Sequence, residues 1–292
     1  MYDRIVVPVD GSPFAEEVIP YALGIAQATG AKLTLLRIAE KDSKSAEAES
    51  DAYVQTLAAK FLVEGRSVFG RDDVSASILR EADRIPGTLV AITSHGRGGV
   101  FTAMLGSVAR EIVHASHKPV LVWRPDGKED SARPTRITTV LLPLDGTSLS
   151  ESMGPEAVEW AHALQAGLTI VQVLPANARF DSLLSAYDVL DSSYVSSRAS
   201  DLKQRFGIEA DWEVLYGDPA ESIARYLDGR RDVVAVMATR TRSALKAAVL
   251  GSVTSEMVHK AGIPIIVQAP IMSRRDTAAA THVSHHNGAA VG

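Results

Sequence analysis

The residues best suited to chemistry stand where apolar runs end. Asp10, Gly11 and Ser12 follow one such run, and Gly106-Ser107 opens a stretch with helical spacing. A carboxylate can accept hydrogen bonds from ribose hydroxyls or help to hold a phosphate-bound Mg²⁺. A helix N-terminus offers free N–H groups and a partial positive charge to an anion. These residue types together predict a site for a phosphate-bearing ligand.

A glycine-rich loop lies between these two phrases, at residues 94–99, and reads Ser-His-Gly-Arg-Gly-Gly. Glycine lets a backbone approach an anion closely, and the Arg97 side chain could reach a phosphate from this loop. In an open parallel α/β sheet, ligands bind at the carboxyl ends of the strands. Both the loop and Asp10 follow predicted strands, so we expect them at the same edge of the sheet.

Each of these features also has a plainer explanation, which the sequence leaves open. Asp10-Gly11 is a common turn, and Ser12 could serve only as a helix cap. Gly106-Ser107 could be an ordinary helix start, and the glycines at 98–99 could form a flexible loop.

Patterns for other chemistry are missing. The chain has no G-x-x-x-x-G-K-[ST] loop, no G-x-G-x-x-G after its first apolar run, and no H-E-x-x-H or Ser/His/Asp arrangement that stands out. His95, His114 and His259 are isolated, and such histidines more often pack or hydrogen-bond than catalyse. The histidines at 282–286 lie in a polar stretch and are expected in a solvated tail rather than at a metal.

Both phrases occur twice, in the same order. Residues 8–12, Pro-Val-Asp-Gly-Ser, return as 143–147, Pro-Leu-Asp-Gly-Thr, and the Leu-Gly-Ser-Val of 105–108 returns at 250–253. Repeats this long indicate a duplicated domain rather than a solenoid, whose repeats are about 20–50 residues. The second half carries extra residues, mostly within 175–197, where we expect a longer surface loop, with a functional lid as the alternative.

Short apolar runs alternate with helical spacing in each half. In the first half we expect strands at 5–9, 33–38, 67–69, 89–93 and 120–123, and helices at 16–29, 51–63, 78–85 and 106–116. Strands separated by helices predict right-handed βαβ units and a parallel sheet. We therefore expect one domain over 1–125, a linker over 126–134, a second domain over 136–270 and a disordered tail over 271–292.

The composition narrows the classes of function. The chain has 292 residues, 46% of them hydrophobic, a net charge of −5 and no cysteine. This charge argues against a nucleic-acid surface, and the lack of cysteine excludes disulfides and fits an intracellular location. No apolar run approaches the roughly 20 residues of a membrane span. The first strand signal begins at Arg4, so we expect no signal peptide and a cytoplasmic protein.

The duplicated phrases resemble those of the universal stress protein family, in its tandem two-domain form. The resemblance covers about 1–125 and 136–270, and it rests on the Asp-Gly-[Ser/Thr] phrase and the closing Gly-Ser-Val phrase, each present in both halves. It implies two Rossmann-like domains of the adenine nucleotide alpha hydrolase-like type. Each would be a five-stranded parallel sheet of order 3-2-1-4-5 with flanking helices.

The ATP-binding branch of that family shares the spacing G-x₂-G-x₉-G-[ST]. The matching positions here are Thr93, Gly96, Gly106 and Ser107, so three of the four fit. In the family the position of Thr93 lies close to the ribose, and a side chain there would weaken or tilt the nucleotide without abolishing its binding.

The second half matches that spacing less well, at Ala238, Thr241, Gly251 and Ser252, because both early glycines are absent. The resemblance therefore implies ATP, with or without Mg²⁺, more readily in the first half than in the second. The candidate nucleotide-binding residues are Pro8, Val9, Asp10, Gly11, Ser12, Ile38, Thr93, His95, Gly96, Arg97, Gly99, Gly106, Ser107, Val108, Asp145, Val173, Gly251, Ser252 and Val253.

The resemblance also implies how the halves associate. The last strands, 120–123 and 265–268, can pair across a pseudo-twofold axis, so that one chain mimics the dimer usual in the family. Such pairing would cover two sheet edges. A homodimer of whole chains and an unknown protein partner are further expectations.

Three functions compete. The first is an ATP-binding stress-response or signalling module with little or no turnover. The second is an interaction protein whose nucleotide sites have decayed, which Thr93, Ala238 and Thr241 support. The third is an ATP-dependent adenylating enzyme, which usually has a Ser-Gly-Gly-rich loop after its first strand. The Asp-Gly-Ser-Pro of 10–13 has too little glycine for that loop, so the third function is the least favoured.

Overall fold

Strands and helices alternate along the part of the chain that the structure, a computed structural model, describes: residues 2–39, 44–70, 73–95, 105–124, 134–176, 187–242 and 247–269. The strands are β1 (Arg4–Pro8), β2 (Lys32–Ala39), β3 (Glu64–Phe69), β4 (Thr88–Thr93), β5 (Val120–Trp123), β6 (Thr139–Leu144), β7 (Gly167–Leu174), β8 (Ala210–Tyr216), β9 (Val233–Ala238), β10 (Arg240–Arg242), β11 (Ala247–Val249) and β12 (Ile265–Gln268). The helices are α1 (Pro13–Glu16), α2 (Ile19–Thr29), α3 (Lys44–Phe61), α4 (Val74–Asp83), α5 (Ser107–Ala115), α6 (Ser148–Glu151), α7 (Gly154–Leu164), α9 (Tyr187–Phe206), α10 (Pro219–Tyr226) and α11 (Ser252–Lys260).

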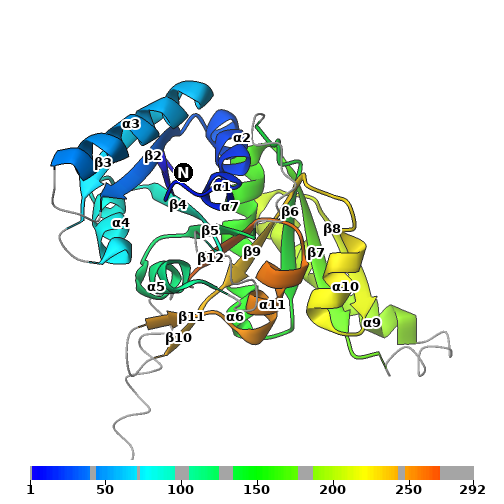
Figure 1. Ribbon diagram of the computed structural model, residues 1–292. Coiled ribbons are helices and arrows are strands. Elements are labelled where there is room, and N and C mark those ends of the chain that lie inside the picture. Colours follow the sequence, from blue (N-terminus) through cyan, green and yellow to red (C-terminus); the bar gives the residue numbers. More distant parts are fainter. Residues whose placement is uncertain are drawn as a thin grey trace, which may run out of the picture.

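One sheet of ten strands runs through both halves of the chain, in the order β3-β2-β1-β4-β5-β12-β9-β6-β7-β8 (Figure 1). Within each half the strands are parallel and follow the order 3-2-1-4-5. The predicted α/β fold with two tandem domains is therefore confirmed. The strands are short and largely apolar because helices cover both faces of a parallel sheet.

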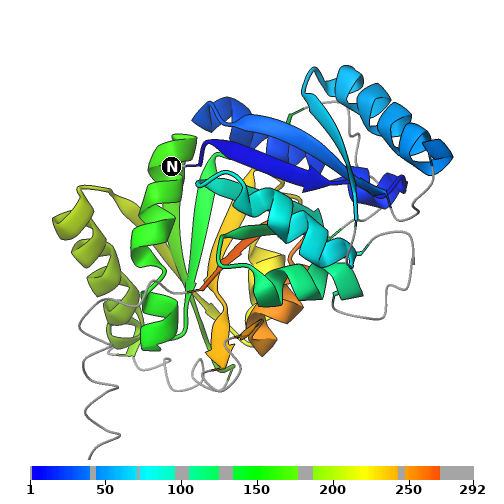
Figure 2. The same ribbon diagram turned by 90° about the vertical axis from the view of Figure 1, so that its left-hand side faces the viewer.

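The two halves join through their last strands. β5 and β12 pair antiparallel, with Val120 opposite Val267 and Val122 opposite Ile265. All four of these residues are at most 1% exposed. The pairing predicted between 120–123 and 265–268 is thus present within one chain, and it removes the sheet edge that each half would otherwise leave open. Figure 2 shows the first half, in blue through cyan to blue-green, beside the second half, in green to orange.

Two apolar cores lie on opposite faces of this sheet. Side chains alternate between them along each strand, so that Ile5 and Val7 belong to one core while Val6 belongs to the other. The first core is covered by α2, α3, α7 and α9, and the second by α4, α5, α10 and α11. Each core runs through both halves, so the two halves pack against each other continuously.

A second contact between the halves lies where α2 passes α7 (Figure 1). The ring of Tyr2 stacks on that of Trp160 in α7, with 5.0 Å between their centroids. Thr135, in the segment that leads into the second half, donates its backbone N–H to the Pro20 carbonyl at 2.9 Å. This segment lies so close to α2 that only a glycine, Gly24, fits beneath the Thr135 carbonyl.

Two expectations about helices are wrong. The helix predicted over 16–29 is broken at residues 17–18 into α1 and α2, because Pro20 stands in the first turn of α2, where a residue without an N–H is tolerated. The loop expected over 175–197 ends by Tyr187, where α9 begins. Serine and aspartate are weak helix formers, but Val195, Ala199 and Leu202 bury one side of α9 in the first core.

After β9, the short strands β10 and β11 pair antiparallel and form a small second sheet. Several predictions fall outside the described residues: those for Gly96, Arg97 and Gly99, for most of the linker 126–134, and for the tail 271–292. Among the described residues, no helix is both long and apolar enough to cross a membrane.

Candidate functional site

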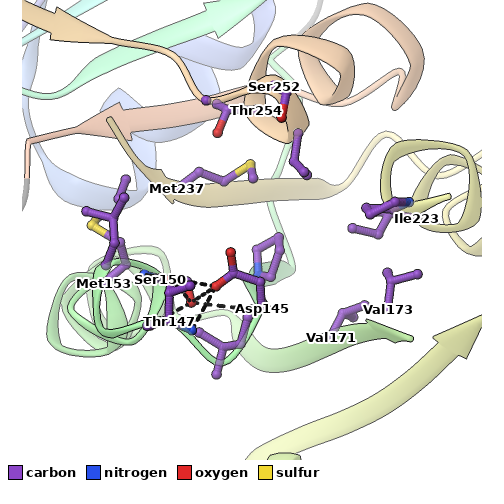
Figure 3. Close-up of a pocket in the computed structure, with 17 residues that line it drawn as sticks. Asp145, Thr147, Ser150, Met153, Val171, Val173, Ile223, Met237, Ser252 and Thr254 are labelled. Atoms are coloured by element: carbon purple, nitrogen blue, oxygen red, sulfur yellow. Dashed lines mark hydrogen bonds between the residues drawn. The ribbon is translucent and has the colours of Figure 1, made fainter. Parts of the chain in front are cut away.

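A pocket of about 270 Å³ opens in the second half, at the carboxyl ends of β6, β7 and β9 (Figure 3). It is lined by Pro143, Leu144, Asp145, Thr147, Leu149, Ser150, Met153, Val171, Val173, Pro219, Ile223, Met237, Ala238, Gly251, Ser252, Val253 and Thr254. This is the edge of the sheet at which ligands of parallel α/β folds bind. The sequence analysis expected a site at this same edge, after strands one and four.

The walls of the pocket are mostly apolar. Val171 and Val173 project from the end of β7, Met237 from β9 and Ile223 from α10, while Met153 lies just before α7 (Figure 3). Apolar walls with a few converging polar groups are the usual composition of small-molecule sites. A flat aromatic group would find van der Waals contacts here, and the polar groups would fix its orientation.

Asp145 supplies the acidic group at one side of the pocket. Its Oδ1 accepts hydrogen bonds from the hydroxyls of Thr147 and Ser150, both at 2.6 Å, and from the Thr147 N–H at 3.0 Å. Burial alone would raise the pKa of this carboxyl, but the donors of Ser150 and Thr147 together outweigh burial and lower the pKa. Asp145 therefore stays ionised at neutral pH, in an orientation fixed by one of its two oxygens.

The local sequence explains this arrangement. Gly146 has a φ of +79°, in the left-handed region that glycine adopts without strain, so the chain turns sharply after Asp145. Thr147 then caps α6 by accepting the Ser150 N–H at 3.3 Å. The turn and the cap together bring both hydroxyls back onto the carboxylate.

The opposite side of the pocket is the start of α11. Gly251 is the N-cap residue, and its extended backbone (φ −65°, ψ 162°) leads into the helix at Ser252. Figure 3 shows Ser252 and Thr254 across the pocket from Asp145. The first N–H groups of a helix have no partner within it and carry partial positive charge. The pocket thus has an anionic side and a side suited to an anion.

The first half repeats part of this geometry. Asp10 Oδ1 accepts from the Ser12 N–H at 2.9 Å and from its hydroxyl at 2.6 Å, and Gly11 has a φ of +87°. Ser12 also caps α1, through the Ala15 N–H at 3.2 Å. The cap that the sequence left open for Ser12 is therefore present together with the bond to Asp10. Ala15 stands where the second half has Ser150, so Asp10 lacks that hydroxyl donor.

The other end of the first-half site is also in place. Gly106 caps α5, donates its N–H to the Ser94 carbonyl at 2.8 Å, and leaves only 3.3 Å between an added Cβ and that oxygen. Thr93 donates its hydroxyl to the His95 carbonyl at 2.9 Å, and His95 Nδ1 lies 3.0 Å from the Ser94 hydroxyl. These contacts hold the ends of the loop whose middle lies outside the described residues.

The structure thus brings together in one pocket the predicted second-half residues Asp145, Val173, Gly251, Ser252 and Val253. In the first half, Pro8, Val9, Asp10, Gly11, Ser12, Ile38, Thr93, His95, Gly106, Ser107 and Val108 occupy the matching strand ends and helix start. Sequence reasoning missed Ser150 and Thr254. Their only signal was positional, since each is a polar residue where the first half has alanine, at Ala15 and Ala109.

A hydrogen bond between a tyrosine and a glutamate is present in both halves, on the face of the sheet covered by α3 and α9. Tyr194 of α9 donates to Glu151 at 2.9 Å, and Tyr53 of α3 donates to Glu16 at 2.9 Å. The two glutamates end the short helices that follow the two aspartates. The bond therefore ties the long helix of each half to the turn that carries its acidic group.

Replacing Tyr194 with phenylalanine should remove this tie. We expect a loss of about 1 kcal/mol in the free energy of unfolding, the usual contribution of one hydrogen bond, measured by urea unfolding of the whole chain. The Tyr53→Phe variant is the matched control, and we expect a loss of the same size. Wild-type stability in both variants would show that neither bond contributes.

Comparison with known proteins agrees with the fold and with the duplication. A family model described as the universal stress protein family matches residues 1–124 and again 136–268. The chain belongs to the universal stress protein family. A universal stress protein of Mycobacterium tuberculosis is 29% identical over 192 residues, which are 61% of this chain and 61% of that protein. The chain spans 61% of the length of such curated relatives.

Other relatives and structural neighbours have lower sequence identity. One from Methanocaldococcus jannaschii is 23% identical over 136 residues, 44% of this chain and 79% of that protein. The crystal structure of a universal stress protein from Archaeoglobus fulgidus matches with a TM-score of 0.60 at 18% identity, covering 92% of this chain and 99% of that one. The crystal structure of a functionally unknown protein from Pseudomonas aeruginosa matches with a TM-score of 0.61 at 19% identity, covering 92% of this chain and 93% of that one. These structures share the fold.

Proposed function

We propose that this universal stress protein binds an adenine nucleotide, ATP in the first instance, and acts as a stress-response or signalling module. The observation that carries the proposal is the second-half pocket, in which the fixed carboxylate of Asp145 faces the start of α11 across apolar walls. A nucleotide has the matching sequence of groups: a flat base, a sugar with hydroxyls and an anionic phosphate.

Each group of the ligand has a candidate partner. The free oxygen of Asp145 would accept from ribose hydroxyls, and the first N–H groups and hydroxyl of Ser252 would donate to phosphate. Val171, Val173 and Ile223 would contact the base. The volume of about 270 Å³ lies near the lower end of small-molecule pockets, roughly 300–1,000 Å³. It suits the base and sugar, with phosphates directed toward α11.

Titration calorimetry of the purified whole chain with ATP and Mg²⁺ tests the proposal. We expect saturable binding, and at 100 times the Kd a gain of about 2.7 kcal/mol in stability. Asp145→Ala should weaken binding about tenfold to hundredfold, because a hydrogen bond to a charged group is lost.

The matched control is Asp228→Ala, which removes an exposed aspartate near the amino end of β9, away from the pocket. It should leave the affinity for ATP unchanged. Equal affinity in the wild type and in Asp145→Ala would exclude this pocket as the site. No binding and no shift in melting temperature at millimolar ATP would favour the second function, an interaction protein without nucleotide, which the absence of both early glycines in the second half supports.

Little or no turnover is part of the proposal, and an assay for phosphate release by the ATP-bound chain tests it. Among the described residues, no group of three or more acidic, histidine or cysteine side chains is placed to hold a metal ion. In this proposal any Mg²⁺ would arrive bound to the phosphates of ATP. A cytoplasmic location, a protein partner and a homodimer complete the proposed role.

A further inference from the structure

Two side chains at the end of the second strand differ in size between the halves. Leu36 pairs with Pro8 in the first half, and Val171 pairs with Pro143 in the second, so the register makes Leu36 and Val171 equivalent. Two residues further on, Ile38 and Val173 are equivalent by the same register. Each position therefore carries one more carbon in the first half than in the second.

The burial of the two pairs differs mainly at the second position, Ile38 and Val173. Leu36 is fully buried and Ile38 is 4% exposed, and both belong to the core that includes Ile78 and Ile92. A methyl group of Ile38 also lies against Gly70, at 2.8 Å from where a Cβ would stand. Val171 is itself 1% exposed, although it lines the pocket, whereas Val173 is only half-buried and faces the pocket.

The polar groups also differ between the halves, and the difference again favours a ligand site in the second half. The second half has Ser150 as an additional donor to Asp145, and Thr254 at the start of α11, where the first half has Ala15 and Ala109. Leu149 of the pocket corresponds to the larger Phe14. Phe14, Leu36 and Ile38 therefore add apolar volume in the first half, although Val9 and Val18 are smaller than Leu144 and Met153. The second half has the additional hydroxyl donors Ser150 and Thr254.

We propose that the chain binds one adenine nucleotide rather than two, in the second half, and that the residues at 36/171 and 38/173 decide which half is open. This inference rests on the proposed function. It reverses the preference for the first half that the glycine spacing suggests. The glycines only allow the backbone to approach phosphate, whereas the strand positions determine whether the base can enter.

Reciprocal substitutions in the whole chain test the inference, with binding measured by titration calorimetry with ATP and Mg²⁺. Val171→Leu together with Val173→Ile should lower the affinity of the second-half site at least tenfold. Leu36→Val together with Ile38→Val should raise the stoichiometry from one ATP per chain toward two. The matched control is Leu33→Val with Leu35→Val, the same chemistry on the opposite face of β2, which should keep the stoichiometry at one.

The melting temperature without ligand shows whether each variant folds, since filling a core can cost about 1–3 kcal/mol. If the Val171→Leu/Val173→Ile variant does not fold, the number of ATP molecules bound by the wild type and by the Leu36→Val/Ile38→Val variant still tests the inference. Two ATP per wild-type chain, or unchanged affinity in a folded Val171→Leu/Val173→Ile variant, would overturn this inference but leave the proposed function standing. A wild type that binds no ATP would instead overturn the proposed function.

Discussion

Replacing Glu81 with glutamine is expected to lower the free energy of unfolding by about 3 kcal/mol or more. The Glu81 side chain is 4% exposed, and its carboxylate lies 3.3–3.4 Å from the guanidinium groups of Arg4, Arg66 and Arg84. The Arg4 side chain is itself only 8% exposed. Removing one partner of a buried ion pair leaves an uncompensated charge, which typically costs about 3–5 kcal/mol.

Urea unfolding of the wild type and of the Glu81→Gln variant measures this effect. Glu221→Gln is the matched control, because Glu221 pairs with Lys260 at 3.0 Å but is 57% exposed, and such surface pairs contribute about 1 kcal/mol or less. A loss of similar size in both variants would contradict the special role of the Glu81 cluster. The ATP affinity of Glu81→Gln should not change, because the cluster lies at the amino ends of the strands, opposite the site.

The second large effect is expected at Gly24. A Cβ there would lie 1.8 Å from the carbonyl oxygen of Thr135 and 2.7 Å from its carbonyl carbon. Both are backbone atoms, so Gly24→Ala must push the connecting segment off α2. Alanine normally stabilises a helix interior by about 0.5–1 kcal/mol relative to glycine. We expect a net loss of about 1–3 kcal/mol instead, together with faster proteolysis of the connection between the halves.

Gly154→Ala provides the comparison for this prediction. Gly154 begins α7, and an added Cβ would meet only a terminal methyl of Leu202, at 3.3 Å. The Leu202 side chain is flexible and can move away by that small amount. We expect little change in stability in that variant. A Gly24→Ala chain as stable as the wild type would show that the Thr135 segment does not need its close contact with α2.

The fold could be predicted from the sequence because short apolar runs, turn residues and the internal repeat all indicate the same architecture. The run before Asp10 and its copy before Asp145 each form the central strand of a half, and the last strands pair as predicted. The errors fell where local propensity yields to tertiary packing. α9 forms through serine and aspartate because Val195 and Leu202 are buried, and Pro20 divides a stretch whose spacing is otherwise helical.

The candidate site could be predicted from the sequence only in part. Asp145 and Ser252 were found from the motif, and the described contacts place them at one pocket. Ser150 and Thr254 carry no motif, because a hydroxyl one turn into a helix looks like an ordinary surface residue. We attribute the open pocket to the one carbon fewer at Val171 and Val173, and sequence patterns that sort residues only as apolar or polar treat leucine, isoleucine and valine alike.

The most direct measurement is a crystal structure of the whole chain grown with ATP and Mg²⁺. Our account predicts nucleotide density in the second half, with the base against Val173, the sugar beside Asp145 and phosphate at the start of α11. Density for ATP at any other surface, or a second-half pocket that stays empty at saturating ATP, would contradict it.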